Sequence, residues 1–420
     1  MKETSHTTLP MSAAMALRVF IPFALGYFLS YLYRVVNAVI APDLIADMGL
    51  DASALGLLTA AYFLTFAAAQ LPLGILLDHY GPRRIEAGLL VFGALGAAVF
   101  AFAPNTETLI IGRALIGFGV SACLMAAFKS YVMWFPKERL ALINGFQMMA
   151  GGLGALAATQ PVEAMMDFTD WRGVFWILAA LTLLSAVMIY YMVPEHGGGR
   201  HPDAKLSDAL GGVKTIFTSA QFWRVAPWCV FSQATFLSVQ GLWAGPWLRD
   251  VASLSRAEVA EHLLWVATAM VAGNFVWGVI ADRAQKHFGL RPMVVSSFGM
   301  ACFLVVQAMI ITQLTATQPE QIIITWMAFS FFATAGILPY AALSQMFPAA
   351  LAGRVNTSIN LLVFVIAFIA QWAIGAIIDL WPHTSTGGYA TQGYQAAFAT
   401  MLGLQICGLV WYVIRHKVRL

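Results

Sequence analysis

Long apolar stretches separated by short polar segments are the dominant pattern of the chain. Each stretch provides the roughly 20 residues that a helix needs to cross a bilayer. A backbone in lipid must satisfy its hydrogen bonds internally, so stretches of this length predict helices. Twelve stretches have centres near Tyr27, Phe66, Leu95, Phe118, Gly152, Leu181, Thr235, Met270, Phe303, Phe332, Ala367 and Leu404. We therefore expect an all-α membrane protein with twelve transmembrane helices, the first running from about Ala16 to Pro42.

The longest polar segment divides the twelve stretches into two sets of six. It contains three consecutive glycines, Gly197 to Gly199, and several charges, which is typical of a linker. The expected organisation is an N-terminal six-helix half at 1–193, a cytoplasmic linker at 194–221 and a C-terminal six-helix half at 222–420.

The two halves repeat one loop pattern. Gly74 and Asp78 follow the second apolar stretch, and Gly278 and Asp282 follow the eighth with the same spacing. This repeat predicts a duplication, with two pseudo-symmetric halves.

Composition supports the membrane assignment and excludes several classes of function. Hydrophobic residues make up 60% of the chain and charged residues 10%, against about 25% charged in soluble domains. The four cysteines lie inside apolar stretches without metal-ligand spacing, so no metal site is expected. No phosphate-binding loop, zinc-protease motif or nucleophile triad is present, and we expect no enzyme, no cofactor and no nucleic-acid partner.

The distribution of basic residues predicts the orientation in the membrane. With both termini in the cytoplasm, fifteen lysines and arginines of the loops and ends fall inside. Only Arg172, Arg249 and Arg256 fall outside. Because basic residues are enriched in cytoplasmic loops, this pattern predicts a multi-pass inner-membrane protein with both termini inside. Lys205 is then cytoplasmic and Asp47 periplasmic.

The loop from Gly74 to Arg84 resembles the loop between the second and third helices of the major facilitator superfamily. The pattern there is approximately G-x-x-x-D-[RK]-x-G-[RK]-[RK], and His79 and Pro82 replace two of its basic positions. The resemblance extends over nearly the whole chain and implies the major facilitator fold. In that superfamily this loop latches the outward-open state. The residues with this implied conformational role are Gly74, Asp78, Gly81, Arg83, Arg84, Gly278, Asp282 and Arg283.

Arg113 begins a second motif of the same kind. Arg113 to Gly119 resembles the superfamily's R-x-x-Q-G-x-G motif, with Ile116 in place of the glutamine. A structural role and a coupling role both remain open for this arginine. Asp78 lies at the negative end of a helix dipole, so we expect its charge to be balanced by Arg83, Arg84, Arg113 or the start of another helix.

Arg34 is the strongest candidate for a functional residue. It lies eight residues before Pro42, or about 12 Å along a helix. An arginine in hydrocarbon costs at least about 2.5 kcal/mol, so it must face a wet cavity or a partner. One interpretation is a structural role, either in an ion pair or with its donors bonded to backbone carbonyls. The other is an anion-binding site, because a guanidinium forms paired hydrogen bonds to carboxylate or phosphate.

The segment Tyr31 to Asn37 favours the anion-binding interpretation. Its pattern is similar to the first helix of organophosphate:phosphate antiporters and anion:cation symporters, where this arginine contacts the anionic substrate. Tyr33 stands where many proton-coupled members have an aspartate, and the seventh helix lacks the antiporters' second arginine. Lys129 matches a basic position of the antiporters, although a lysine at the cytoplasmic interface is an equal alternative.

Aromatic and amide residues complete the predicted substrate site. The set is Tyr31, Arg34, Tyr62, Lys129, Gln147, Gln240, Trp243, Tyr340 and Asn360. Glycine and proline at Gly241–Trp247 and Gly336–Tyr340 predict interrupted helices beside it.

We therefore expect a monomeric secondary transporter that moves a small organic anion by alternating access, with protons or a counter-anion as coupling partner. The alternative is a proton-coupled drug or metabolite efflux antiporter, and a receptor or enzyme built on this fold ranks below both. No aspartate or glutamate lies at the centre of the first, fourth, seventh or tenth helix, and Glu163 and Asp379 lie near the outer ends of their stretches. Import and export both remain open.

Overall fold

The computed structural model describes residues 13–195, 206–314, 318–348, 351–384 and 388–414, and these residues are almost entirely helical. The predicted all-α class is confirmed. Part of the expected linker, including Lys205, lies outside the described residues. The first nine helices are α1 (Ala13–Val35), α2 (Asn37–Met48), α3 (Ala52–Tyr80), α4 (Pro82–Ala101), α5 (Thr106–Gly119), α6 (Cys123–Trp134), α7 (Lys137–Ala157), α8 (Gln160–Met166) and α9 (Trp171–Met192).

The remaining elements follow in the same alternation of long helices and short turns. They are α10 (Leu206–Phe217), α11 (Ala220–Ser238), η1 (Val239–Trp243), α12 (Ala244–Asp250), α13 (Arg256–Phe288), α14 (Pro292–Thr312), α15 (Pro319–Ala333), η2 (Thr334–Ile337), α16 (Leu338–Gln345), α17 (Ala352–Ile378) and α18 (Thr391–Ile414).

Short polar side chains fix where several long helices begin. Asp51, Asn105 and Asp170 each accept a hydrogen bond from the backbone N–H three residues later, at the starts of α3, α5 and α9. Ser255 and Glu258 form a reciprocal capping box at the start of α13. These caps satisfy N–H groups that the first turn of a helix leaves free.

Ten stretches of the described residues form helices, some joined in pairs, that are long and apolar enough to cross a membrane. Two further segments complete the twelve predicted spans. One is α7, whose first turn is polar, and the other is α11 with η1 and α12.

Two helical interruptions differ in form from the prediction. The first predicted helix does not continue to Pro42, because α1 ends at Val35 and Pro42 lies inside the separate α2. The interruption expected at Gly241–Trp247 is the π-helical turn η1, which begins at Val239 and ends at Trp243, where α12 follows. The segment at Gly336–Tyr340 overlaps the 3-10 turn η2.

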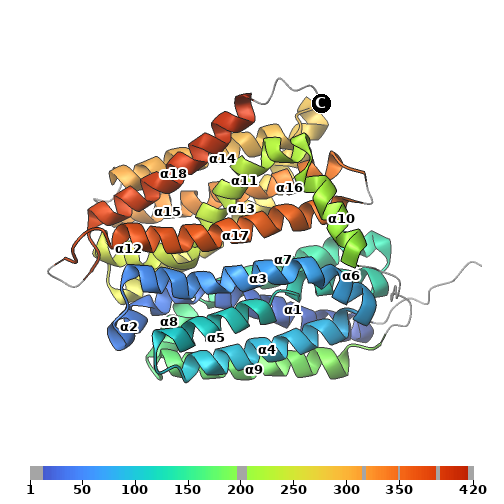
Figure 1. Cartoon of the computed structure of the whole chain (residues 1–420), viewed down its shortest axis with the longest axis horizontal. Helices are drawn as coiled ribbons and strands as arrows, with labels where there is room; N and C mark the ends of the chain where they lie inside the picture. The colour runs from blue at the N-terminus through green and yellow to red at the C-terminus, as the bar shows by residue number, and fades with distance from the viewer. Residues whose placement is uncertain (1–12, 196–205, 315–317, 349–350, 385–387, 415–420) are drawn as a thin grey trace, which may run out of the picture.

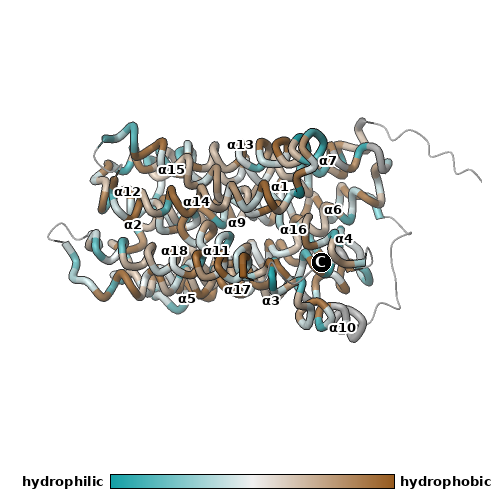
Figure 2. Tube along the Cα trace, turned by 90° about the horizontal axis from the view of Figure 1, so that it is seen from above, coloured by the Kyte–Doolittle hydropathy of each residue, from teal (hydrophilic) through white to brown (hydrophobic). Residues whose placement is uncertain are grey.

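The helices form two groups that meet along a lengthwise seam. Figure 1 shows α1 to α9 on one side and α11 to α18 on the other, and α3 packs against α17 where they meet. We call these groups the first half and the second half. Figure 2 shows hydrophilic residues gathered at the two ends of the bundle. We call them the Asp51 end and the Asp78 end, since α3 begins beside the first residue and carries the second in its last turn.

A candidate binding cavity around Arg34

A cavity of about 330 Å³ lies between the two halves. Its walls come from α1, α3, α6 and α7 on one side and from α11, η1, α13, η2, α16 and α17 on the other. Most of the lining is apolar or aromatic. Arg34 is the one charged side chain among its described lining residues.

The guanidinium of Arg34 lies in an aromatic enclosure. Its central carbon is 4.5 Å from the ring centroid of Tyr31, 5.3 Å from that of Phe364 and 5.5 Å from that of Phe66. The residue is 8% exposed, and its Nε has no hydrogen-bond partner. No described carboxylate forms an ion pair with it, so the predicted alternative of a structural ion pair does not hold here.

The break between α1 and α2 positions Arg34. A helix end leaves carbonyl groups without intrahelical partners. The Tyr33 carbonyl receives a hydrogen bond from Arg113 Nη1 at 2.9 Å, and Asn37 Nδ2 donates to Thr59 Oγ1 at 2.9 Å. Arg113 is buried, so of its two proposed roles this contact supports the structural one.

The second half faces Arg34 with neutral polar groups. Tyr340 donates to Asn360 Oδ1 at 3.4 Å, and Ser344 donates to Asn356 Oδ1 at 2.7 Å. Gln240 Nε2 lies 3.4 Å from Met270 Sδ. These bonds hold the amide side chains at the wall. The arrangement offers one cation opposite several hydrogen-bonding groups.

The structure brings five of the nine predicted substrate residues to the cavity wall. They are Tyr31, Arg34, Gln240, Tyr340 and Asn360.

Three others are buried beside the cavity with partners of their own. Tyr62 donates to the Ser30 carbonyl at 3.2 Å, and Trp243 Nε1 donates to the Gln371 carbonyl at 3.1 Å. Gln147 accepts a hydrogen bond from Tyr131 at 2.7 Å. These contacts orient the helices that line the cavity. A direct role for these residues in binding stays a prediction.

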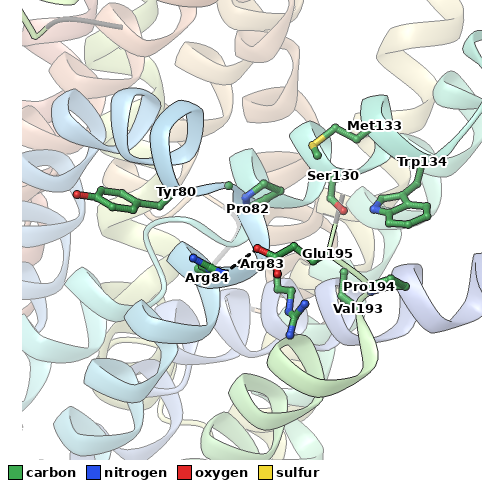
Figure 3. A pocket seen from close by; sticks show the side chains of 11 residues that line it. Tyr80, Pro82, Arg83, Arg84, Ser130, Met133, Trp134, Val193, Pro194 and Glu195 are labelled. Atoms are coloured by element: carbon green, nitrogen blue, oxygen red, sulfur yellow. Dashed lines mark hydrogen bonds and ion pairs between the residues drawn. The ribbon is translucent and has the colours of Figure 1, made fainter. Parts of the chain in front are cut away.

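Lys129 lies at the Asp78 end and forms an ion pair with Asp78. This corrects the expected balancing of Asp78 by Arg83, Arg84 or Arg113. Arg83 Nε instead donates to the Tyr190 carbonyl at 2.8 Å. Arg84 Nη2 bonds Glu195 Oε1 at 2.7 Å across a small pocket, as Figure 3 shows.

The repeated loop of the second half has simpler contacts. Asp282 pairs with Lys286, one turn later on the same helix, at 2.8 Å. Arg283 is exposed, and a Cβ added at Gly278 would meet nothing within 4 Å. Gly74 is equally open, whereas Gly81 has a φ of +84° that favours glycine in the turn.

At the Asp51 end, charged groups join the two halves. Arg256 of α13 bonds Asp43 of α2 at 2.9 Å and Glu163 of α8 at 2.6 Å. The Asp379 carboxylate, beyond α17, accepts hydrogen bonds from the N–H groups of Ala52 at 3.0 Å and Ser53 at 2.6 Å. A carboxylate at a helix N-terminus is stabilised by the helix dipole. Both contacts hold this end closed.

The backbones also touch at the Asp51 end. A Cβ added to Gly245 would lie 2.1 Å from the Ala38 carbonyl oxygen, and one added to Gly375 would lie 2.2 Å from that of Ala52. Only glycine permits such an approach between helices. Beside this closure, Arg172 donates to Asp47 and lowers the pKa of that carboxyl, so the stabilisation from this pair is lost as pH falls through that lowered value.

Sequence reasoning missed several lining residues. Asn274 and Asn356 lie on the wall, and Phe66 and Phe364 enclose Arg34. An amide inside an apolar stretch was a usable signal for the two asparagines. Nothing distinguished these two phenylalanines from the many others in the apolar stretches.

A bundle of membrane-length helices in two halves around a buried cavity is the architecture of a multi-pass membrane transporter. The family model described as Major Facilitator Superfamily matches residues 23–371, and the chain belongs to that superfamily.

Two relatives are named for the compounds they transport, and a third matches over most of its length. A probable sulfoacetate transporter of Cupriavidus necator is 26% identical over 63% of this chain and 64% of its own length. A putative tartrate transporter of Agrobacterium vitis is 22% identical over 66% of this chain and 58% of its own length. The chain therefore spans less than two thirds of either relative. The inner membrane transport protein YdhP of Escherichia coli is 22% identical over 88% of this chain and 89% of its own.

Solved structures show the same fold. A bacterial homolog of the human lysosomal transporter Spinster gives a TM-score of 0.75 at 16% identity, covering 97% of this chain and 98% of that chain. The nucleoside transporter NupG gives a TM-score of 0.77 at 11% identity, covering 95% and 100%.

Proposed function

We propose that the chain is a secondary active transporter that moves a small organic anion across the inner membrane by alternating access. The observation that carries the proposal is Arg34, a buried cation without a carboxylate partner on the wall of the central cavity. Burying an unpaired charge is costly, so its retention is explained by a ligand that completes the pair.

The cavity matches such a ligand in size and chemistry. Small-molecule sites of roughly 300–1,000 Å³ commonly combine apolar walls with a few placed polar groups. The guanidinium supplies a planar set of donors to a carboxylate or sulfonate, and the amides of the second half can bond hydroxyl or carbonyl groups. Relatives named for sulfoacetate and tartrate support the anionic class.

The contacts at the Asp51 end support a mechanism in which the cavity is closed at one end of the bundle at a time. We place that end outside the cell and the Asp78 end in the cytoplasm, following the distribution of basic residues. In this orientation the contacts at the Asp51 end close the outer side, which supports an inward-facing state with both termini inside. Transport then requires the Arg256 and Asp379 contacts to open while the two halves close at the Asp78 end.

The apolar lining favours one competing function, proton-coupled efflux of a drug or apolar metabolite. Phe66, Phe128, Phe236 and Phe364 all lie on the wall. In that case Arg34 acts in coupling or packing. The two functions differ in the ligand that the cavity accepts.

Thermal stabilisation of the purified protein by matched ligands tests the proposal. The panel contains sulfoacetate, tartrate, galactonate, its neutral counterpart galactose, and the apolar cation ethidium. We expect anions to raise the melting temperature and galactose to leave it unchanged, since ligand binding to the folded state stabilises it. Stabilisation by ethidium alone contradicts the proposal and supports efflux.

A further inference from the structure

Glu86 is a buried carboxyl group without a basic partner among the described residues. It lies in the second turn of α4, is 0% exposed, and neither of its oxygens has a hydrogen-bond partner. The arginines beside it on the same helix are engaged elsewhere, Arg83 by the Tyr190 carbonyl and Arg84 by Glu195. An ionised carboxylate in such a place costs several kcal/mol, so the group is neutral in this state.

The surroundings of Glu86 come from three neighbouring helices. Gly26 of α1 leaves room for the carboxyl, since a Cβ there would lie 2.6 Å from Oε1, and Ser185 of α9 borders the same space. The titratable groups that face the carboxyl among the described residues are Cys123 and Tyr131, both on α6. None of these groups carries a positive charge that could hold a carboxylate.

Glu86 lies close to the cavity across α1. Its carboxyl lies against Gly26, and the next residue, Tyr27, lines the cavity. Arg34 lines the same cavity eight residues after Gly26, so the carboxyl lies behind the cavity wall. Charges inside a protein act on one another strongly, because little water screens them.

We propose that Glu86 is a proton-binding site that couples proton movement to the anion at Arg34. The proposal rests on the proposed transport function. An ionised Glu86 opposes an anion in the cavity, and a proton taken from cavity water removes that opposition. The proton therefore binds before the anion and leaves after it, to water on the opposite side of the membrane. Linkage makes the effect reciprocal, so anion binding favours the protonated carboxyl.

Infrared spectroscopy of the protein without ligand tests the proton site directly. We expect the carbonyl stretch of a protonated carboxylic acid at neutral pH, with loss of this band in Glu86→Gln. The matched control is Glu107→Gln, at an exposed carboxylate of α5, which keeps the band. A band of the same size in Glu86→Gln overturns the proposal, whatever the substrate proves to be.

Transport measurements test the coupling. In proteoliposomes carrying wild-type protein, a pH gradient should drive accumulation of sulfoacetate. Glu86→Gln, which mimics the neutral carboxyl, should lose accumulation but keep exchange of internal for external sulfoacetate, and its sulfoacetate affinity should no longer vary with pH. Unchanged gradient-driven accumulation in Glu86→Gln refutes the coupling role. Absence of sulfoacetate transport by wild-type protein, with the infrared band lost as expected, refutes the substrate class and leaves the proton site standing.

Discussion

Arg34 owes its position to the backbone as much as to its side-chain neighbours. The end of α1 at Val35 leaves a free carbonyl at Tyr33, and Arg113 occupies it. Arg34, the buried cation next to Tyr33, is thereby left for the cavity. Its depth in the first apolar stretch was readable from the sequence. The aromatic enclosure was not, because Phe364 reaches it from a helix more than 300 residues away in the chain.

Two substitutions of Arg34 distinguish the contribution of its positive charge from that of its paired hydrogen bonds. We expect Arg34→Lys to bind the anion more weakly and retain some transport, and Arg34→Ala to lose binding. Each lost hydrogen bond to a charged group contributes about 1.5–3 kcal/mol, or roughly ten- to a hundredfold in affinity. Isothermal titration with the stabilising anion measures the effect, and Arg291→Ala, at an exposed arginine that does not line the cavity, serves as the matched control.

The melting temperature of the same variants identifies the opposite outcome. Arg34 forms no ion pair with a described residue, so Arg34→Ala should melt within a few degrees of wild type. A large loss of stability points to a structural role. Wild-type affinity in a well-folded Arg34→Ala protein would end the anion-binding hypothesis.

The Asp78–Lys129 pair gives a second prediction at the residue scale. Asp78→Asn should slow transport but leave the protein folded, because a partly exposed ion pair contributes only about 0–1 kcal/mol. Lys129→Gln should have the same effect without weakening anion affinity. A double-mutant cycle on the transport rate measures their coupling. A drop in affinity for Lys129→Gln alone favours the substrate role predicted from sequence.

The helices themselves were the most predictable part of the fold. Apolar length gave the spans, and polar caps such as Asp51, Asp170 and Ser255 mark where they begin. The breaks were harder, since the α1–α2 junction at Val36 contains neither glycine nor proline. That junction is held by tertiary contacts, which periodicity along one stretch does not report. The sequence does not distinguish Glu86 from an exposed loop carboxylate, because it follows the polar turn at Arg83 and Arg84.

The closure at the Asp51 end gives a prediction for whole elements. Arg256 is the only described side chain bonded to both Asp43 and Glu163. Arg256→Gln should release α13 from α2 and α8 and favour the state open at this end. A cysteine at Val39, in the pocket beside Arg256, should then react faster with an impermeant thiol reagent.

The accessibility experiment needs two controls. Cys302 and Cys407 are replaced by serine, since they are the described cysteines that are not buried. Arg291→Gln removes an exposed arginine just before α14, beyond the far end of α13, and should leave the reaction rate unchanged. Equal reactivity in Arg256→Gln and wild type contradicts the closure.

At the scale of the whole molecule, orientation is the first question. Single cysteines at Asp47 and Lys205 should report opposite sides of the membrane. In intact cells an impermeant reagent should label position 47 and leave position 205 protected. The reverse pattern inverts the proposed topology and turns the observed state into one open to the outside.

Flux of an organic anion into proteoliposomes tests the central claim most directly. The labelled substrate is the anion that stabilises the purified protein most. We predict saturable uptake by wild-type protein, loss of uptake in Arg34→Ala, and competition by other organic acids but not by galactose. Uptake that persists unchanged in Arg34→Ala, or competition by galactose and ethidium in place of organic acids, would contradict the account.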